Sequence, residues 1–295
     1  MSGKISVFRS SKGEAEYFAA YNAILKQWPV PYEEIYVPTS LGDTHVIASG
    51  PRDGTPLLLF HPSGAGATIW YRNVGQLSKH FRIYAVDTIG EPNKSILTRP
   101  ISRSHQRQQF AAWISDLLNG LQIDKAHLVG NSFGGFLVLN TVLHIPERIK
   151  KAVLISPAAS FVQIWSWSWH FMPSIGIGRL TGSEWALLRP YNWIWQNFPV
   201  DDHIAKLRTL TALEGRHRHW SPSVFNDEEL RKIQTPILLL IGDHEVIYNP
   251  ETVMRKASRL VAGLKAEIIS DANHNAEYTA PEAVNEKIIS FLLDP

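Results

Sequence analysis

The sequence predicts an α/β protein: a mostly parallel sheet of eight strands, with helices on both faces and an inserted, mainly helical cap. Three observations lead to this prediction. Six apolar runs rich in Val, Ile and Leu lack the alternation of half-exposed strands, and helical stretches separate most of them. One interval of about 80 residues interrupts this rhythm, which is too long for a structureless loop in a compact domain.

The N-terminal segment predicts a leading helix and a hairpin. Residues 13–28 have apolar positions at helical spacing and end just before Pro29. Two strand-like runs follow at 33–40 and 43–50, and the short turn between them indicates an antiparallel pair.

The remaining strands and helices alternate along the chain. The predicted strands are 56–61, 81–87, 126–132, 149–156, 236–242 and 264–270. The predicted helices among and after them are 103–120, 133–145, 250–262 and 281–293. Alternation of this kind implies parallel strands joined by right-handed crossovers.

The interval between Ser156 and Pro236 predicts an inserted subdomain. We therefore divide the chain into a core of residues 1–157 and 232–295 and a cap of residues 158–231. Seven of the ten tryptophans fall in the cap. Most of the cap's aromatic residues are expected to form its own small core. The side chains predicted to line a substrate pocket are Trp165, Trp169, Phe171 and Trp193.

Composition narrows the class of protein. The charge balance is 29 − 27 = +2 without a long basic block, which argues against a nucleic-acid partner. The chain has no cysteine, so disulfides and thiolate metal sites are excluded, and a reducing cytoplasm fits. The N-terminus lacks a signal-peptide apolar region, and no window is long and apolar enough to span a membrane. We expect a cytoplasmic protein with no membrane partner.

Gly130-Asn131-Ser132-Phe133-Gly134 is the strongest chemical motif. It fits G-x-S-x-G and lies where a predicted strand passes into a helix. In this setting the turn is sharp and the glycines admit neighbouring backbone without a Cβ clash. The motif predicts Ser132 as a nucleophile rather than an ordinary helix-capping serine.

A serine nucleophile needs a base, and the base needs an orienting acid; for this kind of turn both follow the serine, acid before base. His274 follows the last predicted strand and is the expected base. The other histidines after the serine are His203, His217, His219 and His244. Asp243 and Glu245 both follow the strand 236–242, so position alone leaves the acid open. Asp87, after strand 81–87, is expected to be structural.

An oxyanion formed at Ser132 needs two backbone N–H donors. Phe133, directly after the nucleophile, is the first. The second is expected from the glycine-rich loop after strand 56–61, which runs from His61 to Gly66.

His217 and His219, in the basic segment 215–219, are possible metal ligands. No carboxylate or cysteine cluster accompanies them in the sequence, so a solvated loop is the expected structure and no metal site or cofactor is predicted.

Taken together, these motifs resemble the α/β-hydrolase superfamily over nearly the whole chain. Several stretches are similar to Bacillus-type carboxylesterases, including those that act on esters of arylpropionic acids. They are THVIASGP (44–51), IWYRN (69–73), YAVDTIGEPNKS (84–95), PERIKKAVLISPA (146–158), DEELRK (227–232), PILLLIGDHEVIYNP (236–250) and VNEKIISF (284–291).

The resemblance supplies assignments that the residues alone leave open. It aligns Glu245 with the family's acid and makes Ser63 the second oxyanion donor, because Pro62, where the family usually has glycine, lacks an N–H. It implies a cofactor-free, monomeric or weakly associating enzyme that cleaves small-molecule carboxylic esters. Alternatives are a C–C bond hydrolase, an aminopeptidase, an acyltransferase or a non-catalytic ligand receptor.

Overall fold

The computed structural model describes residues 3–196 and 198–294, with residues 165–172 described through their backbone alone. The strands are β1 (Tyr32–Thr39), β2 (Gly42–Ser49), β3 (Thr55–Phe60), β4 (Phe81–Val86), β5 (Ile96–Leu97), β6 (Ala126–Asn131), β7 (Ile149–Ile155), β8 (Ile237–His244) and β9 (Lys265–Asn273). The helices are α1 (Ser11–Leu25), α2 (Tyr71–Leu77), α3 (Gln106–Gly120), α4 (Phe133–His144), α5 (Trp165–Thr181), α6 (Glu184–Trp195), α7 (Asp202–Glu214), α8 (Asp227–Arg231), α9 (Pro250–Leu260), α10 (Ala276–Thr279) and α11 (Pro281–Leu293), with 3₁₀ turns η1 (Ala67–Trp70) and η2 (Pro146–Arg148).

All strands join one sheet in the order β1-β2-β4-β3-β6-β7-β8-β9, with the two-residue β5 paired to β2. The pairs β1–β2, β2–β4 and β2–β5 are antiparallel, and every other pair is parallel. The predicted mostly parallel sheet is confirmed, and the short β5 adds one strand to the predicted eight. Each predicted strand overlaps an observed one, because unbroken apolar runs mark strands that are buried on both faces.

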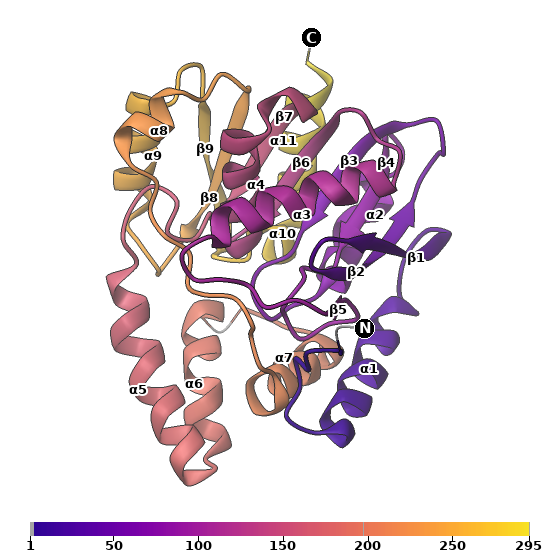
Figure 1. Ribbon diagram of the computed structural model, residues 1–295. Helices are drawn as coiled ribbons and strands as arrows, with labels where there is room; N and C mark the ends of the chain where they lie inside the picture. Colours follow the sequence, from indigo (N-terminus) through magenta and orange to yellow (C-terminus); the bar gives the residue numbers. More distant parts are fainter. Residues whose placement is uncertain (1–2, 197, 295) are drawn as a thin grey trace.

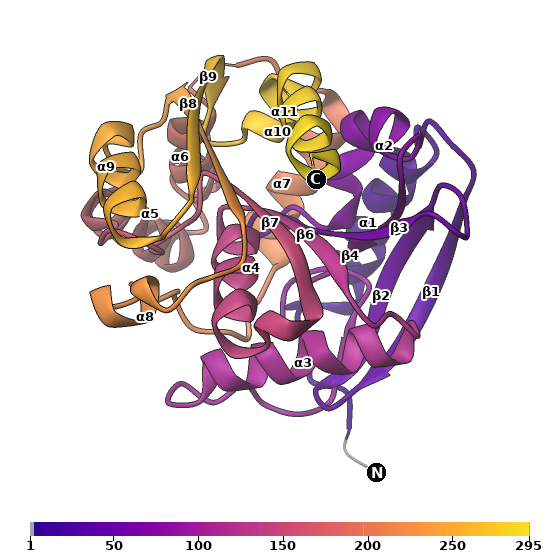
Figure 2. The same cartoon turned by 90° about the horizontal axis from the view of Figure 1, so that it is seen from above.

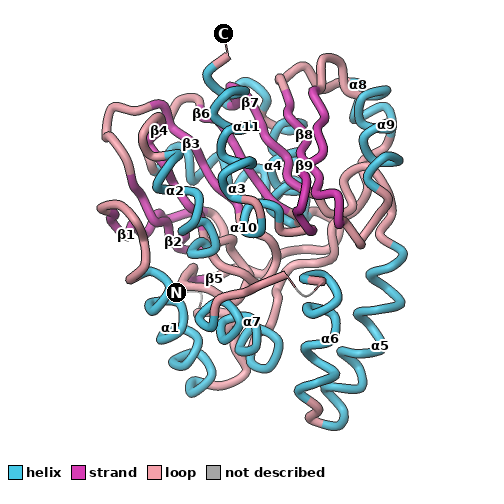
Figure 3. The backbone as a smooth tube through the Cα atoms, turned by 180° about the vertical axis from the view of Figure 1, so that it is seen from behind, coloured by secondary structure: helices cyan, strands magenta, loops and turns pink. Residues whose placement is uncertain are grey.

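Helices cover both faces of this sheet. Alternate residues of β3 point to opposite sides: Leu58 packs in one core cluster with Trp113 of α3, whereas Leu57 packs in the other with Val74 of α2. Helices α3 and α4 lie on the face toward the viewer in Figure 1, and α2 and α11 lie on the face seen from behind in Figure 3. Seen from above, the twisted sheet runs between these two layers (Figure 2).

The carboxyl ends of the parallel strands all meet at one edge of the sheet, and helices α5, α6 and α7 lie beyond that edge (Figure 1). These helices follow β7 and precede β8 in the chain. Helices α5 and α6 form an antiparallel pair, and Gly182, at a φ of 71°, ends α5 in the left-handed conformation that glycine adopts easily. The boundaries of a separate cap at residues 158 and 231 stay a prediction.

Helix α1 lies beside α7 near the same edge of the sheet (Figure 1). It begins where the Ser10 side chain accepts a hydrogen bond from the N–H of Gly13, a standard N-terminal cap. Among the described residues, no helix is both long and apolar enough to cross a membrane.

Candidate active site

Ser132 lies in the turn between β6 and α4 with a φ of 53° and a ψ of −114°, a conformation that a non-glycine residue rarely adopts. Two hydrogen bonds hold this strained turn. The Ser132 N–H donates to the carbonyl of Ile155 at 2.9 Å, and the N–H of Ala158 donates to the Ser132 carbonyl at 3.0 Å. The serine is therefore anchored to the neighbouring strand β7 and to the loop that follows it.

The glycines of the motif are required by close backbone approach. A Cβ on Gly130 would lie 2.2 Å from the carbonyl oxygen of Gly134, and a Cβ on Gly134 would lie 2.1 Å from that of Phe60. Neither distance is sterically possible, so the turn can form only with glycine at both positions. Local sequence thus explains how the chain presents Ser132 at the edge of the sheet.

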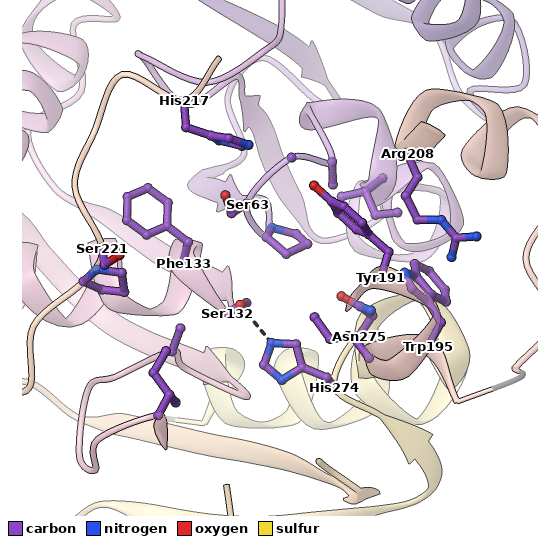
Figure 4. Close-up of a pocket in the computed structure, with 18 of the residues that line it drawn as sticks. Ser63, Ser132, Phe133, Tyr191, Trp195, Arg208, His217, Ser221, His274 and Asn275 are labelled. Carbon is purple, nitrogen blue, oxygen red and sulfur yellow. Dashed lines mark hydrogen bonds between the residues drawn. The ribbon is translucent and has the colours of Figure 1, made fainter. Parts of the chain in front are cut away.

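His274 contacts Ser132 from the far end of the chain. Its Nε2 lies 2.8 Å from the Ser132 Oγ, a contact drawn in Figure 4, and its Nδ1 lies 2.7 Å from Oε2 of Glu245. Because an ionised carboxylate only accepts, Nδ1 carries the proton in the neutral ring, and Nε2 presents its lone pair to the serine hydroxyl. The structure brings Ser132, His274 and Glu245 into one hydrogen-bonded chain.

Glu245 and Asp243 occupy different environments despite their closeness in sequence. Glu245 is buried beside His274, and its Oε1 accepts the N–H groups of Val246 and Ile247 at 2.9 and 2.8 Å. Asp243 is exposed and accepts the backbone N–H groups of residues 271 and 272 instead. Only Glu245 contacts the imidazole.

The backbone N–H groups of Ser63 and Phe133 donate no hydrogen bond within the part of the chain that the structure describes. Phe133 is the first residue of α4, so its N–H has no partner inside the helix. Both residues line the same pocket as Ser132. The two N–H groups are thus available to an anion formed at the serine.

A buried carboxylate holds the loop that carries Ser63. Glu91 is fully buried, and it accepts the Ser63 hydroxyl and the Gly64 N–H at 2.6 Å each. The oxygen that accepts the Ser63 hydroxyl, Oε1, also lies 2.7 Å from Nε2 of His219 and 3.5 Å from Nδ1 of His217. Burial alone would raise the pKa of Glu91, but the charges and hydrogen bonds of the two histidines hold that pKa well below its ordinary value.

The expectation of a solvated loop at 215–219 agrees with the exposed His217 and is wrong for the side chain of His219. His219 is nearly buried, and its ring stacks on Phe133 with 4.2 Å between the centroids. His217 and His219 both line the pocket. Both histidines contact Glu91, which lies 126 positions before His217 and 128 positions before His219 in the chain. No local sequence pattern could therefore predict this contact.

A second buried network lies behind the same loop. Asp87 accepts hydrogen bonds from Nδ1 of His45 at 2.8 Å, from the Tyr21 hydroxyl at 3.0 Å and from the N–H of Ala67 at 2.7 Å. Burial by itself would raise the pKa of Asp87, but the bond and charge of His45 lower it below its ordinary value. Asp87 does not line the pocket, which agrees with the structural role expected for it.

The pocket over Ser132 is lined from the sheet edge and from the inserted helices. Figure 4 shows Ser132 and His274 at its floor, Phe133 and Ser221 on one side, and Tyr191, Trp195 and Arg208 on the other. The full lining comprises Pro62, Ser63, Gly64, Ala65, Ile69, Ser132, Phe133, Ala158, Ile164, Ile175, Tyr191, Ile194, Trp195, Ile204, Leu207, Arg208, His217, His219, Ser221, Pro222, His274 and Asn275.

The predicted aromatic lining differs from the observed one. Trp193 lies outside this lining and packs near the buried Ile194 and Ile247. The side chains of Trp165, Trp169 and Phe171 lie outside the described residues. The sequence did not single out Trp195 and Arg208 as lining residues, because it does not show which face of each cap helix meets the core.

Two groups of described side chains have ligand atoms close enough for a metal ion: Glu91, His217 and His219, and the exposed group Asp243, His244 and Asp271. In the first group the Glu91 carboxylate already accepts hydrogen bonds from Ser63 and Gly64. In the second, Asp243 accepts two backbone N–H groups. Hydrogen bonding thus accounts for Glu91 in the first group and for Asp243, one of the two acids, in the second.

A family model described as the alpha/beta hydrolase fold matches residues 55–281. The chain belongs to the α/β-hydrolase family. Two similar proteins of Bacillus subtilis (strain 168) are each 37% identical to it. They are an uncharacterized carboxylesterase, nap, aligned over 97% of this chain and 95% of its own length, and carboxylesterase YbfK, aligned over 97% and 96%.

Solved structures give the same relationship. Carboxylesterase CesB (YbfK) from Bacillus subtilis matches this hydrolase with a TM-score of 0.88 at 33% identity, over 96% of this chain and 99% of that one. Naproxen esterase (carboxylesterase NP) from Bacillus subtilis matches with a TM-score of 0.86 at 36% identity and the same coverage. The predicted resemblance to Bacillus-type carboxylesterases is confirmed.

The hydrolase also contains a buried acid close to Ser132. Glu277 is fully buried and accepts a hydrogen bond from the Asn131 side chain, next to Ser132. Burial raises the pKa of Glu277 to about 7, against smaller lowering effects of Asn131 and His274. Its Oε1 and the Asn131 Oδ1 have no partner among the described residues. A buried carboxylate that accepts so few hydrogen bonds is poorly stabilised as an anion, which agrees with the raised pKa.

We predict that Glu91→Ala lowers the free energy of unfolding by about 3–5 kcal/mol, because it leaves the partly buried Ser63 hydroxyl and the buried Gly64 N–H without an acceptor. Glu91→Gln keeps an acceptor and should cost only about 1–2 kcal/mol. Urea unfolding at pH 8 measures both values. A Glu91→Ala protein as stable as the original would contradict this account of the loop.

We predict that Glu277→Gln stabilises the protein more at pH 8 than at pH 4.5. With a folded pKa of about 7 and an ordinary value of 4.5, the unfolded chain loses its proton first, so the original protein loses stability between these pH values. The difference should reach about 2–3 kcal/mol. Urea midpoints at both pH values test it, with the exposed Glu282→Gln as control. Equal gains for Glu277→Gln at both pH values would contradict the raised pKa.

Proposed function

We propose that this chain is a carboxylesterase that cleaves small-molecule carboxylic esters through an acyl-enzyme intermediate. Ser132 is the nucleophile, His274 the general base and Glu245 the acid that orients it. The observation that carries this proposal is the chain of two short contacts, 2.7 Å from Glu245 to His274 and 2.8 Å from His274 to Ser132. Nucleophile, base and orienter at these distances are the parts that acyl transfer to serine needs.

In the first step Ser132 Oγ attacks the ester carbonyl while Nε2 of His274 takes the hydroxyl proton. The imidazolium so formed is stabilised by the Glu245 carboxylate at Nδ1. The other oxygen of Glu245 accepts the backbone N–H groups of Val246 and Ile247, which hold the carboxylate in place beside the ring. The leaving alcohol then receives the proton from His274.

The tetrahedral intermediate carries a negative oxygen, for which we propose the N–H groups of Ser63 and Phe133 as donors. Their lack of assigned acceptors supports this role. Glu91 positions the first donor, since it binds both the Ser63 hydroxyl and the following N–H. Water then attacks the acyl-enzyme along the reverse proton path, and the cycle requires only these groups and water.

We propose that the inserted segment, residues 158–231, is a cap that selects the substrate. The described lining contributed by this segment is mostly apolar, which suits an ester better than a peptide.

An aminopeptidase needs a carboxylate for the substrate amine, and no Asp or Glu belongs to the described lining. The printed names of the relatives, carboxylesterase and naproxen esterase, favour the same activity. A cytoplasmic, monomeric or weakly associating protein stays a prediction.

We expect Ser132→Ala to lose on the order of 10⁶ in kcat on p-nitrophenyl butyrate, because the nucleophile is removed while the binding site stays. Steady-state absorbance at the p-nitrophenolate band measures this loss. A fluorophosphonate probe should label the original protein at Ser132 and leave the variant unlabelled. Substantial residual turnover in Ser132→Ala would refute the assignment, and labelling without any ester turnover would favour another hydrolase activity.

We expect Glu245→Gln to lower kcat by about 10³–10⁴, because a neutral amide neither fixes the imidazole tautomer nor stabilises the imidazolium. Asp243→Asn is the matched control: it removes a carboxylate two residues away that does not contact His274. The control should stay within about threefold of the original rate, in line with a surface substitution. The reverse order of effects would move the acid to Asp243.

A further inference from the structure

Arg208 is a charged side chain in the wall of a mainly apolar pocket. It comes from α7 and lies beside Trp195, with its guanidinium carbon 5.9 Å from a ring centroid of that residue. In Figure 4 it lies with Tyr191 and Trp195 on one side of the pocket. We propose that this pocket takes esters carrying a carboxylate, and that Arg208 binds the carboxylate. The inference rests on the proposed esterase activity and names its substrate class.

The spacing of residues on α7 explains why Arg208 is at the pocket. Ile204, Leu207, Arg208 and Thr211 recur at intervals of three and four and so share one helix face. Ile204 and Leu207 are buried and line the pocket, and the Thr211 hydroxyl donates to the Gly64 carbonyl at 3.0 Å. This face is fixed against the loop that carries Ser63, and Arg208 is held there with it.

Arg208 lacks a counter-charge among the described residues. Its Nε is buried without a hydrogen-bond acceptor, and it forms no ion pair with a described Asp or Glu. The partly buried Arg82 and Arg107 differ in this respect, since each contacts a glutamate, Glu33 and Glu229. Burial lowers the pKa of Arg208, which is the sign of a desolvated cation.

The other charges of the pocket do not compensate Arg208. His217 and His219 lie against Glu91, and the described lining contains no carboxylate. An uncompensated guanidinium beside Ile, Leu and Trp side chains is costly, and an anionic ligand would remove that cost. The pocket is therefore complementary to a substrate that brings one negative charge.

The chemistry of the guanidinium selects the kind of anion. Its planar fork matches the two oxygens of a carboxylate, and a single guanidinium balances one negative charge rather than the two of a phosphate. Ser132 and Arg208 lie at different sides of the pocket (Figure 4), so ester and carboxylate belong at separate ends of the substrate. Half-esters of dicarboxylic acids carry the charge on the acyl side, and esters of hydroxy acids carry it on the alcohol side.

The test compares charged and neutral esters of equal length. One series uses p-nitrophenyl half-esters of dicarboxylic acids from succinate to suberate beside p-nitrophenyl esters of the matching monocarboxylic acids. A second uses butyrate esters of hydroxy acids beside butyrate esters of simple alcohols. We expect Arg208→Met to lower the ratio of charged to neutral kcat/KM by about tenfold to a hundredfold in at least one series, mainly through KM.

Two further variants sharpen the result. Arg208→Lys keeps the positive charge but not the planar guanidinium that binds both carboxylate oxygens. It should lower the ratio of charged to neutral kcat/KM by less than Arg208→Met does. Arg189→Met on the adjacent helix α6 removes an exposed arginine and should leave the ratio unchanged. A ratio unaffected by Arg208→Met in both series, or lowered equally by Arg189→Met, would overturn the proposal.

A binding measurement separates this proposal from the esterase activity. Monomethyl esters of the same dicarboxylic acids are titrated into Ser132→Ala and into Ser132→Ala with Arg208→Met, with calorimetric detection. The second protein should bind about tenfold or more weakly. If the original protein hydrolyses none of the esters, the proposed esterase activity is refuted. If the two variants bind the monomethyl esters equally well, the role of Arg208 is refuted.

Discussion

The backbone of Ser132 is the constraint on which the rest of the site depends. A φ of 53° at a serine is unfavourable, and it persists because β6 ends there, α4 begins there, and two hydrogen bonds tie the residue to β7 and its loop. The strain lifts the hydroxyl out of the sheet edge toward His274, which arrives from the end of β9. Gly130 and Gly134 permit the turn, since any Cβ there would collide with backbone.

Two buried carboxylates near the nucleophile show how environment decides charge. Glu91 lies against two histidines and a pair of donors from the Ser63 loop, and its pKa is held well below its ordinary value. Glu277 lies against the amide of Asn131, and burial raises its pKa to about 7. The first acid holds the Ser63 loop as an anion, while the second favours the neutral form next to Ser132. Both effects arise from what each carboxylate contacts.

The site divides its tasks between two parts of the chain. The sheet edge supplies Ser132, His274 and Glu245 from strand ends, where backbone pairing keeps positions precise. The inserted helices supply most of the wall opposite the nucleophile, including Trp195 and Arg208. In our proposal the first part performs the acyl transfer, and the second decides which ester enters.

The sequence by itself determined the parallel sheet and the strand–turn–helix setting of Ser132, because a buried strand, a glycine turn and a helix start are encoded within about fifteen neighbouring residues. Only the tertiary structure placed Glu245 rather than Asp243 against His274: Asp243, inside β8, accepts backbone N–H groups of β9, whereas Glu245, directly after β8, meets the imidazole. It likewise paired His219 with Glu91, and it put Arg208 rather than Trp193 in the pocket wall. Contacts between residues so far apart in the chain depend on how the helices pack, which local patterns do not encode.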